Sequence, residues 1–241
     1  MALTIFFDFA ATLASSGPGW LVVPFALGLV HALDADHVMA VSVFATRGRG
    51  TAQGVRAGLR WSLGHGLVLL AAGLVLVAFG RSLPESFAGL ADRLVGLTMI
   101  GLGGFVFVEL ARRRAHVHFH AHDGMRPHAH WHGHERSASR DARMAHQHEH
   151  GALLVGALHG LAGSAPILAV LPVAHRSPRL AVAYLVLFGC GVAVAMVGVS
   201  GLLGHVAGRL TRADAGRALS WLRGTGAAGS VAIGAWLAFA G

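Results

Sequence analysis

Charge is scarce in this chain, and lysine is absent from it. Only 12% of the 241 residues are Asp, Glu, Lys or Arg, whereas 54% are hydrophobic, and the mean hydropathy is +0.60. A soluble domain carries about twice that charged fraction. All 19 basic residues are arginine, which we attribute to genome composition. These shortages exclude an ordinary soluble domain and indicate a polytopic membrane protein that forms a single domain over residues 1–241.

Cysteine is almost absent as well, because Cys190 stands alone. An intrachain disulfide is therefore excluded, and so is a thiol-based electron carrier, which needs two intramembrane cysteines. The net charge of +8 does not indicate nucleic-acid binding, because the arginines lie at helix ends and in loops. The N-terminus has no positive region, and Asp8 interrupts its short apolar stretch. We expect an amphipathic or re-entrant lead-in over residues 1–15 in place of a signal peptide.

Six apolar segments are long enough to cross a bilayer, which takes about 20 helical residues. Glycine and alanine are frequent in all six, as is typical where helices pack closely in lipid. We therefore expect an all-α integral membrane protein with six transmembrane helices. The expected spans are 20–46, 51–80, 86–111, 151–173, 179–208 and 217–240.

Arginine placement predicts how these helices are oriented. Fifteen of the 19 arginines fall in the first, third and fifth connections, within residues 47–60, 112–143 and 209–223. By the positive-inside rule, these connections are cytoplasmic and both termini lie outside. We expect a multi-pass protein of the cytoplasmic (inner) membrane.

The two halves of the chain share short motifs. His31-Ala-Leu in the first span matches His159-Gly-Leu in the fourth, and the glycines around His65 match those around Cys190. Three helices per half would make the second copy enter from the opposite side, as an inverted 3+3 repeat. Transporters built in this way bind their substrate near the midplane, where the repeats meet. The match would gather these three histidines and Cys190 around one axis.

The first span contains two aspartates and two histidines within residues 31–37. Each buried aspartate costs about 2.5–3.5 kcal/mol of insertion free energy, so a helix that only had to span would not keep two. Polar bonding between packed helices is the alternative interpretation. Imidazole nitrogen and carboxylate oxygen together suit borderline divalent ions such as Ni²⁺, Co²⁺ and Zn²⁺. On an ideal helix, His31, Asp34 and His37 face one cavity. Unless the helix is locally unwound, Asp36 points elsewhere and orients a ligand or pairs with a neighbouring helix.

Three further side chains within spans are candidate ligands. His65 lies between two glycines, which allow close backbone approach; it is a ligand, a residue that orients one, or a hydrogen-bonded core histidine. His159 precedes Pro166, and proline often marks a broken helix beside a cavity, although a simple packing kink is equally consistent. Cys190 is either a core thiol or a soft ligand.

Histidine dominates the third connection, where residues 116–150 contain 11 histidines, mostly as His-x-His. Such a polar segment cannot form a packed core, so we expect it to be flexible and disordered without a ligand. Alternating imidazoles bind transition metals without selecting one, which favours a cytoplasmic metal buffer or sensor. A hydrophilic spacer or a pH sensor is the alternative. The candidate ligands are His116, His118, His120, His122, His128, His130, His132, His134, His146, His148 and His150.

The sequence His31-Ala-Leu-Asp-Ala-Asp-His37 resembles the HX4DH motif of the nickel/cobalt transporter (NiCoT) family and of its smaller, urease-accessory UreH-like relatives. Leu63-Gly64-His65-Gly66 resembles that family's Leu-Gly-His element. The segment from His159 to Ser164 resembles the His-Gly-Leu-Ala-Gly-Ser element of the UreH-like branch. The resemblance implies passage of Ni²⁺ or Co²⁺ as the transported substrate, with no organic cofactor. It also implies that His31, Asp36 and His37 are essential, with Asp34 and His65 matching the family pattern.

Two features depart from the larger family members. Val30 stands where they usually have arginine, and six helices replace their usual eight. Cytoplasmic His-rich loops also occur in related nickel/cobalt exporters, so the direction of transport stays open.

We therefore expect a transition-metal permease and not an enzyme. In this interpretation His31, Asp34, His37 and His65 form the metal site, and Asp36 and His159 support it. The alternatives are an exporter, or a membrane-anchored metallochaperone or sensor that supplies nickel to cytoplasmic urease or hydrogenase maturation proteins. An intramembrane metallohydrolase is a weaker alternative. It would need a metal-bound water and a general base, which Asp34 or Asp36 could supply, but the resemblance points elsewhere.

Overall fold

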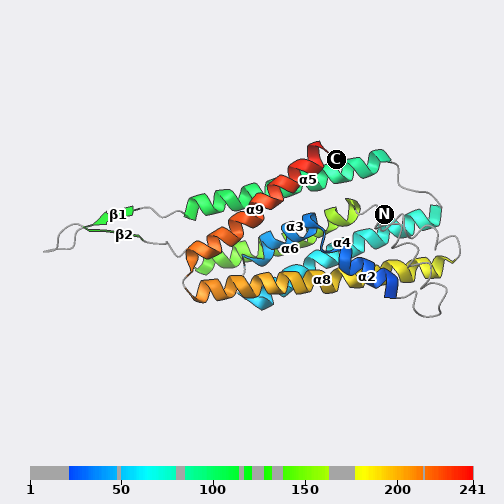
Figure 1. Cartoon of the computed structure of the whole chain (residues 1–241), viewed down its shortest axis with the longest axis horizontal. Helices are drawn as coiled ribbons and strands as arrows, with labels where there is room; N and C mark the ends of the chain where they lie inside the picture. The colour runs from blue at the N-terminus through cyan, green and yellow to red at the C-terminus, as the bar shows by residue number, and fades with distance from the viewer. Residues whose placement is uncertain are drawn as a thin grey trace.

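The computed structural model describes residues 22–47, 50–79, 85–113, 117–120, 128–131, 138–162, 177–213 and 215–240. These residues form seven helices and one two-stranded hairpin, and the hairpin extends from one end of the helix bundle, here called the hairpin end (Figure 1). The expected lead-in and the end of the fourth expected span, residues 163–173, lie outside the described residues. The helices are α2 (Val22–His31), α3 (Ala35–Ala45), α4 (Thr51–Phe79), α5 (Glu85–Arg113), α6 (Ala138–Ala162), α8 (Pro178–Arg212) and α9 (Gly216–Phe239), with strands β1 (Val117–His120) and β2 (His128–Trp131) between α5 and α6.

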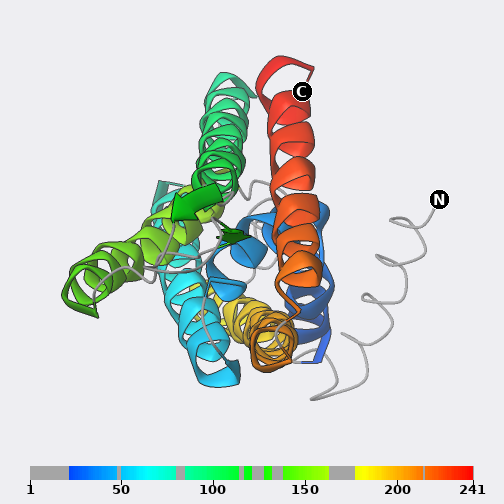
Figure 2. The same cartoon turned by 90° about the vertical axis from the view of Figure 1, so that its left-hand side faces the viewer.

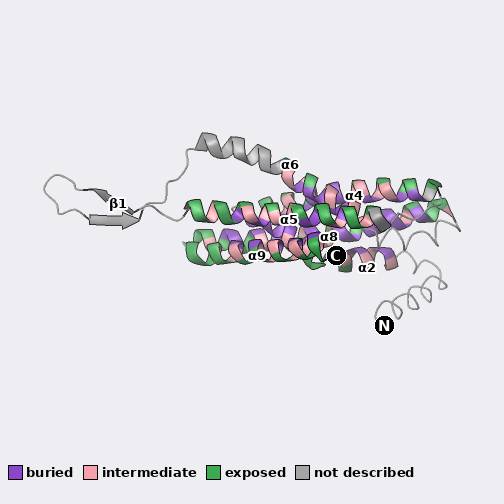
Figure 3. Cartoon of the chain, turned by 90° about the horizontal axis from the view of Figure 1, so that it is seen from above, coloured by how far each residue is buried: buried purple, intermediate pink, exposed green. Residues whose placement is uncertain are grey.

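Three helices are long and apolar enough to cross a membrane, over Thr51–Leu76, Phe87–Arg112 and Pro178–Arg212. The pair formed by α2 and α3 is a fourth candidate span, and α6 contributes a shorter apolar stretch. Exposed residues lie on the outer sides of the helices and buried residues on the inner sides (Figure 3). The outer sides carry many large apolar side chains, which suits contact with lipid. The described residues thus form a helical bundle with three or four candidate membrane spans.

The first of the expected spans is not an ideal helix. Residues 32–34 form a turn after His31, and α3 leaves α2 at an angle of 66°. Asp34 precedes α3 with extended backbone (φ −57°, ψ 144°) and makes no side-chain cap. Its carboxylate instead accepts a hydrogen bond from His31, and such local bonds compete with helix formation. His31 and His37 therefore belong to two helices of different direction.

The His-rich connection contains regular structure where we expected disorder. β1 and β2 pair antiparallel, with Val117 opposite Trp131 and His120 opposite His128. α6 begins at Ala138, well before the expected start of the fourth span. Strict alternation is also the sequence period of a β-strand, which gives a physical reason for the hairpin.

The helices pack in two groups with α3 between them. α4 lies along α8 and along α6, and α2 packs against α8, so these four helices form one group. α5 and α9 lie along each other as a separate pair. α3 contacts members of both groups, and the view from the hairpin end shows it near the centre of the bundle (Figure 2).

Glycines allow two of these helix pairs to approach closely. A Cβ atom at any of four glycines would collide with a backbone carbonyl oxygen of the facing helix. The pairs are Gly28 with Phe188, Gly191 with Phe25, Gly156 with Trp61, and Gly64 with Leu153. The first two pairs join α2 to α8, and the last two join α6 to α4. The same arrangement therefore occurs twice, with Gly28 matching Gly156 and Gly191 matching Gly64.

Candidate metal centre

Four histidine side chains converge where α2 meets α3. His31 is the last residue of α2, and His37 lies in the first turn of α3. His65 projects from α4 and His159 from the last turn of α6. The His37 ring lies 4.5 Å from that of His31, 5.3 Å from that of His65 and 5.4 Å from that of His159, measured between ring centroids. We call these four residues the histidine cluster.

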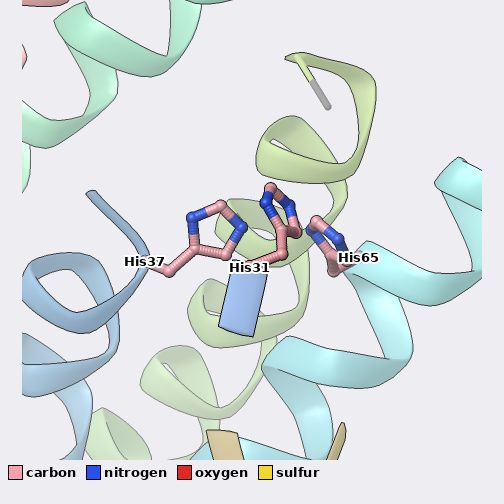
Figure 4. A group of neighbouring side chains, drawn as sticks. All are labelled: His31, His37 and His65. Carbon is pink, nitrogen blue, oxygen red and sulfur yellow. The ribbon is translucent and has the colours of Figure 1, made fainter. Parts of the chain in front are cut away.

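Three members of the cluster can reach one metal ion. One nitrogen atom each of His31, His37 and His65 lies within 4.8 Å of the others. Their rings point toward one another from α2, α3 and α4 (Figure 4). Imidazole nitrogens bind divalent ions at about 2.0–2.1 Å, which places two ligands about 3–4 Å apart. Small side-chain rotations would therefore bring these nitrogens to ligating distance.

Two aspartates orient histidines of the cluster. The His31 Nδ1 atom lies 3.0 Å from Asp34 Oδ2 in a hydrogen bond, and the His37 Nδ1 atom lies 3.0 Å from Asp36 Oδ1. A carboxylate that holds Nδ1 leaves Nε2 for a metal. The Asp34 side chain is 58% exposed and that of Asp36 is 26% exposed. The Asp34 side chain therefore lies at the edge of the cluster, where its contact is with His31, and its predicted role as a ligand stays a prediction.

His159 is held by its own helix. Its Nδ1–H donates to the Val155 carbonyl oxygen at 2.9 Å. Because a carbonyl only accepts, Nδ1 carries the proton and Nε2 keeps a lone pair. That Nε2 is buried and has no hydrogen-bond partner among the described residues. This geometry is consistent with the prediction of His159 as a candidate ligand, in addition to its supporting role.

Unpartnered nitrogen is a shared property of the cluster. Each of its four rings has at least one buried nitrogen without a hydrogen-bond partner among the described residues. A buried polar atom left unpartnered costs about 1–3 kcal/mol. A metal ion bound by one nitrogen of each ring would remove much of this cost and would explain why several unpartnered nitrogens lie together.

Aromatic side chains wall the cluster. The Trp61 ring stacks on His65, with centroids 5.0 Å apart and planes at 12°, and lies 5.1 Å from His37. The Phe188 ring lies 5.4 Å from His31. Both aromatic side chains are fully buried, so they exclude water and restrict the rings. Our sequence analysis missed Trp61, although its position one helical turn before His65 places both on one face of α4.

Other predicted ligands are not part of the cluster. Cys190 is exposed on α8, so the structure does not bring its thiol to the histidines. Of the histidines in residues 116–150, only His150 has a described side chain, and it is exposed. The side chains of the others lie outside the described residues, and their metal binding stays a prediction.

One curated protein shows similarity over most of the chain. It is the urease accessory protein UreH of Bacillus sp. (strain TB-90), which is 26% identical over 186 residues, covering 76% of this chain and 75% of that protein. No protein-family model matches the chain, and no solved structure matches it. The similarity to UreH extends well beyond the short motifs that place the histidines.

Proposed function

We propose that this protein is a permease, not an enzyme, that carries Ni²⁺ or Co²⁺ across the cytoplasmic membrane. The similarity to UreH over most of the chain supports the resemblance to the UreH-like branch. The observation that carries the proposal is the histidine cluster, with its unpartnered nitrogens, at the break of a candidate membrane span. Irregular backbone at membrane depth is tolerated where it lines a cavity or a substrate path.

The donor set determines which ions suit the site. Nε2 atoms of His31, His37 and His159, together with one nitrogen of His65, replace part of the water shell of the ion. Neutral imidazole favours Ni²⁺, Co²⁺ and Zn²⁺ over Mg²⁺ and Ca²⁺, which prefer oxygen ligands. Asp34 and Asp36 supply negative charge from behind two of the rings, as carboxylates commonly do for metal-bound histidines.

The helix ends at the break add to the electrostatics. α2 ends at His31, and the C-terminal end of a helix carries partial negative charge that attracts a cation. The positive N-terminal end of α3 is offset by Asp36 in its first turn. A cation bound at the break is therefore attracted by the end of α2 and is not strongly repelled by the start of α3.

We also propose six spans arranged as an inverted 3+3 repeat, with the Arg-rich hairpin end cytoplasmic and both termini outside. The matched glycine contacts of α2 on α8 and of α6 on α4 support this arrangement. They match Gly64 with Gly191, so His65 corresponds to Val192 and not to Cys190. In this register His65 has no counterpart in the second half, and the metal site is asymmetric.

Flux of ⁶³Ni²⁺ and ⁵⁷Co²⁺ into proteoliposomes tests the permease. We expect His37→Ala to abolish flux, because His37 is the ring that contacts the other three. His205→Ala is the matched control, since His205 is exposed and bonds to Thr51 at 3.2 Å, away from the cluster. Wild-type flux through the His37→Ala protein would refute an intramembrane histidine site.

The name of the relative favours a second candidate, a membrane-anchored metallochaperone or sensor that delivers nickel to cytoplasmic urease or hydrogenase maturation proteins. In that case the His-rich segment would bind and deliver the metal, and the helices would only anchor it in the membrane. Deleting residues 116–134 distinguishes the two candidate functions. A permease should keep its metal flux, whereas a chaperone should lose nickel delivery. A wild-type protein that carries neither ion, while its His-rich segment binds Ni²⁺, would favour this candidate.

A further inference from the structure

The hairpin of β1 and β2 has histidines at matched positions. The strands pair antiparallel, with His118 opposite His130 and His120 opposite His128. Alternate residues of a strand belong to one face of a sheet, and opposite residues of paired strands share that face. The register therefore places these four histidines on one face of the hairpin, here called the histidine face. It separates them from the other seven of the 11 histidines in residues 116–150.

The second face of the hairpin is apolar. The register places Val117 opposite Trp131 and Phe119 opposite Ala129, and all four belong to the face that the histidines do not occupy. A shift of one strand by one residue would place histidines opposite apolar residues and mix the two faces. A disordered metal buffer needs no such separation of residue types, whereas a hairpin with a defined register does.

The spacing of positions on the histidine face suits a single metal ion. Opposite positions of an antiparallel pair have Cβ atoms about 4.5–5.5 Å apart, and diagonal positions lie about 7–8 Å apart, within reach of long side chains. Four nitrogen ligands match the usual coordination number of Zn²⁺. Imidazole nitrogen also suits Ni²⁺ and other borderline divalent ions. The histidine face therefore offers the number and the type of ligands that such an ion takes.

The hairpin also needs stabilisation beyond its own backbone hydrogen bonds. Each strand has four residues, and among the described elements each strand packs mainly against the other. The hairpin extends away from the helix bundle (Figure 1). A two-stranded hairpin by itself is marginally stable at best in water. A metal ion bound across the two strands would add its binding free energy to the folding free energy of the hairpin.

We propose that the four residues of the histidine face form a second metal site, the hairpin site, which binds one Ni²⁺, Co²⁺ or Zn²⁺ ion. Binding of the ion and folding of the hairpin are coupled. The hairpin site is separate from the histidine cluster and does not rest on the proposed permease. It differs from a disordered buffer in having one ion per chain and four defined ligands.

Calorimetric titration of the full chain with Ni²⁺ tests the hairpin site, in a His37→Ala background that disrupts the histidine cluster. We expect one tight binding step at one ion per chain. Replacing His118 and His130 together by alanine should weaken this step by about 100-fold or more, because a four-ligand site loses two ligands. The matched control replaces His122 and His134, which are not part of β1 or β2, and it should keep the tight step.

The two double variants separate the hairpin site from a disordered buffer. Equal losses of affinity in both variants would indicate a buffer and would overturn the hairpin site. An unchanged tight step in the protein that lacks His118 and His130 would overturn it as well. A wild-type protein that carries no ion would refute the permease and leave the hairpin site standing, because the titration measures binding alone.

A disulfide across the apolar face tests the register independently. In a Cys190→Ser background, Val117→Cys and Trp131→Cys occupy opposite positions, and a Cα separation of about 4.5–5.5 Å suits a disulfide. We expect this pair to crosslink on oxidation, and we expect the crosslinked protein to bind Ni²⁺ about tenfold more tightly, because its hairpin is preorganised.

The control for this crosslink is the diagonal pair of Val117→Cys with Ala129→Cys, whose positions lie about 7–8 Å apart. It should crosslink much more slowly than the opposite pair. Equal crosslinking of the two pairs would contradict the register. Crosslinking of the opposite pair without a gain in Ni²⁺ affinity would overturn the coupling between metal binding and the hairpin.

Discussion

Each ring of the histidine cluster lies against a group that can orient it. The Asp34 carboxylate holds His31, and the carboxylate of Asp36, the residue before His37, lies beside the His37 ring. A carbonyl of its own helix holds His159, and stacking on Trp61 restrains His65. The ligand atoms and the groups that orient them are therefore separate residues. Removing an orienting group should weaken metal binding without removing a ligand.

We expect Asp36→Asn to lower Ni²⁺ affinity by about 10–100-fold, the usual effect of losing a carboxylate behind a metal-bound histidine. Asp34→Asn should have a smaller effect, because the Asp34 side chain is 58% exposed and solvent screens its charge. Calorimetry on protein lacking residues 116–134 measures both affinities. A larger loss for Asp34→Asn than for Asp36→Asn would contradict these roles.

The residues of the cluster were predictable from the sequence, and their roles in metal binding stay predictions. Paired aspartates and histidines in an apolar run identified residues 31–37, and His65 and His159 were found as isolated histidines in spans. Helical spacing placed Asp34 with the ligands and His159 with the supporting residues, and these roles stay predictions. The spacing was that of an ideal helix, whereas α2 and α3 meet at 66°. The hydrogen bond between His31 and Asp34 at this break could not be read from residue spacing.

At the level of the elements, the long apolar runs predicted the bounds of most helices well. α4, α8 and α9 lie within a few residues of the expected spans, since such runs in lipid must satisfy their backbone as helix. The His-rich connection was predicted less well, because polarity alone does not distinguish a disordered chain from a hairpin with alternating residues. Ion pairs between elements also could not be predicted from the sequence, because their partners lie far apart in the chain. An example is Glu109, which accepts a hydrogen bond from Arg223.

Glu109 joins three elements, and we expect Glu109→Ala to lower the free energy of unfolding by about 3–5 kcal/mol. The reason is that Arg223, whose side chain is only 6% exposed, would keep a buried charge without this carboxylate. Glu109→Leu combined with Arg223→Met should recover much of the loss, since an apolar replacement of a buried pair is often neutral. Thermal unfolding in detergent measures both. An unchanged melting temperature for Glu109→Ala would show that the pair contributes nothing.

At the scale of the whole molecule, the two halves meet through contacts that occur twice. α2 approaches α8 as α6 approaches α4, in each case through glycines that leave no room for a Cβ atom. Matching motifs in the sequence suggested the repeat but paired Gly64 with Gly189. Under the proposed repeat, the contacts of Gly64 with Leu153 and of Gly191 with Phe25 would instead pair Gly64 with Gly191.

Alanine substitutions distinguish these two registers. Gly64→Ala and Gly191→Ala should each destabilise the protein by about 1–3 kcal/mol, because the added methyl group meets a backbone carbonyl. Gly66→Ala and Gly189→Ala should be tolerated, since a Cβ atom at either position has nothing within 4 Å. Thermal unfolding of the four variants decides the question. Equal effects at positions 64 and 66 would contradict the close approach.

The most direct test of the metal site is X-ray absorption at the nickel edge, on protein lacking residues 116–134 and loaded with one equivalent of Ni²⁺. We predict a first shell that contains several imidazole nitrogens and no sulfur, because four histidines converge and Cys190 is exposed. His37→Ala should lose this signal. A sulfur ligand, or an unchanged spectrum in His37→Ala, would contradict the site at the break between α2 and α3.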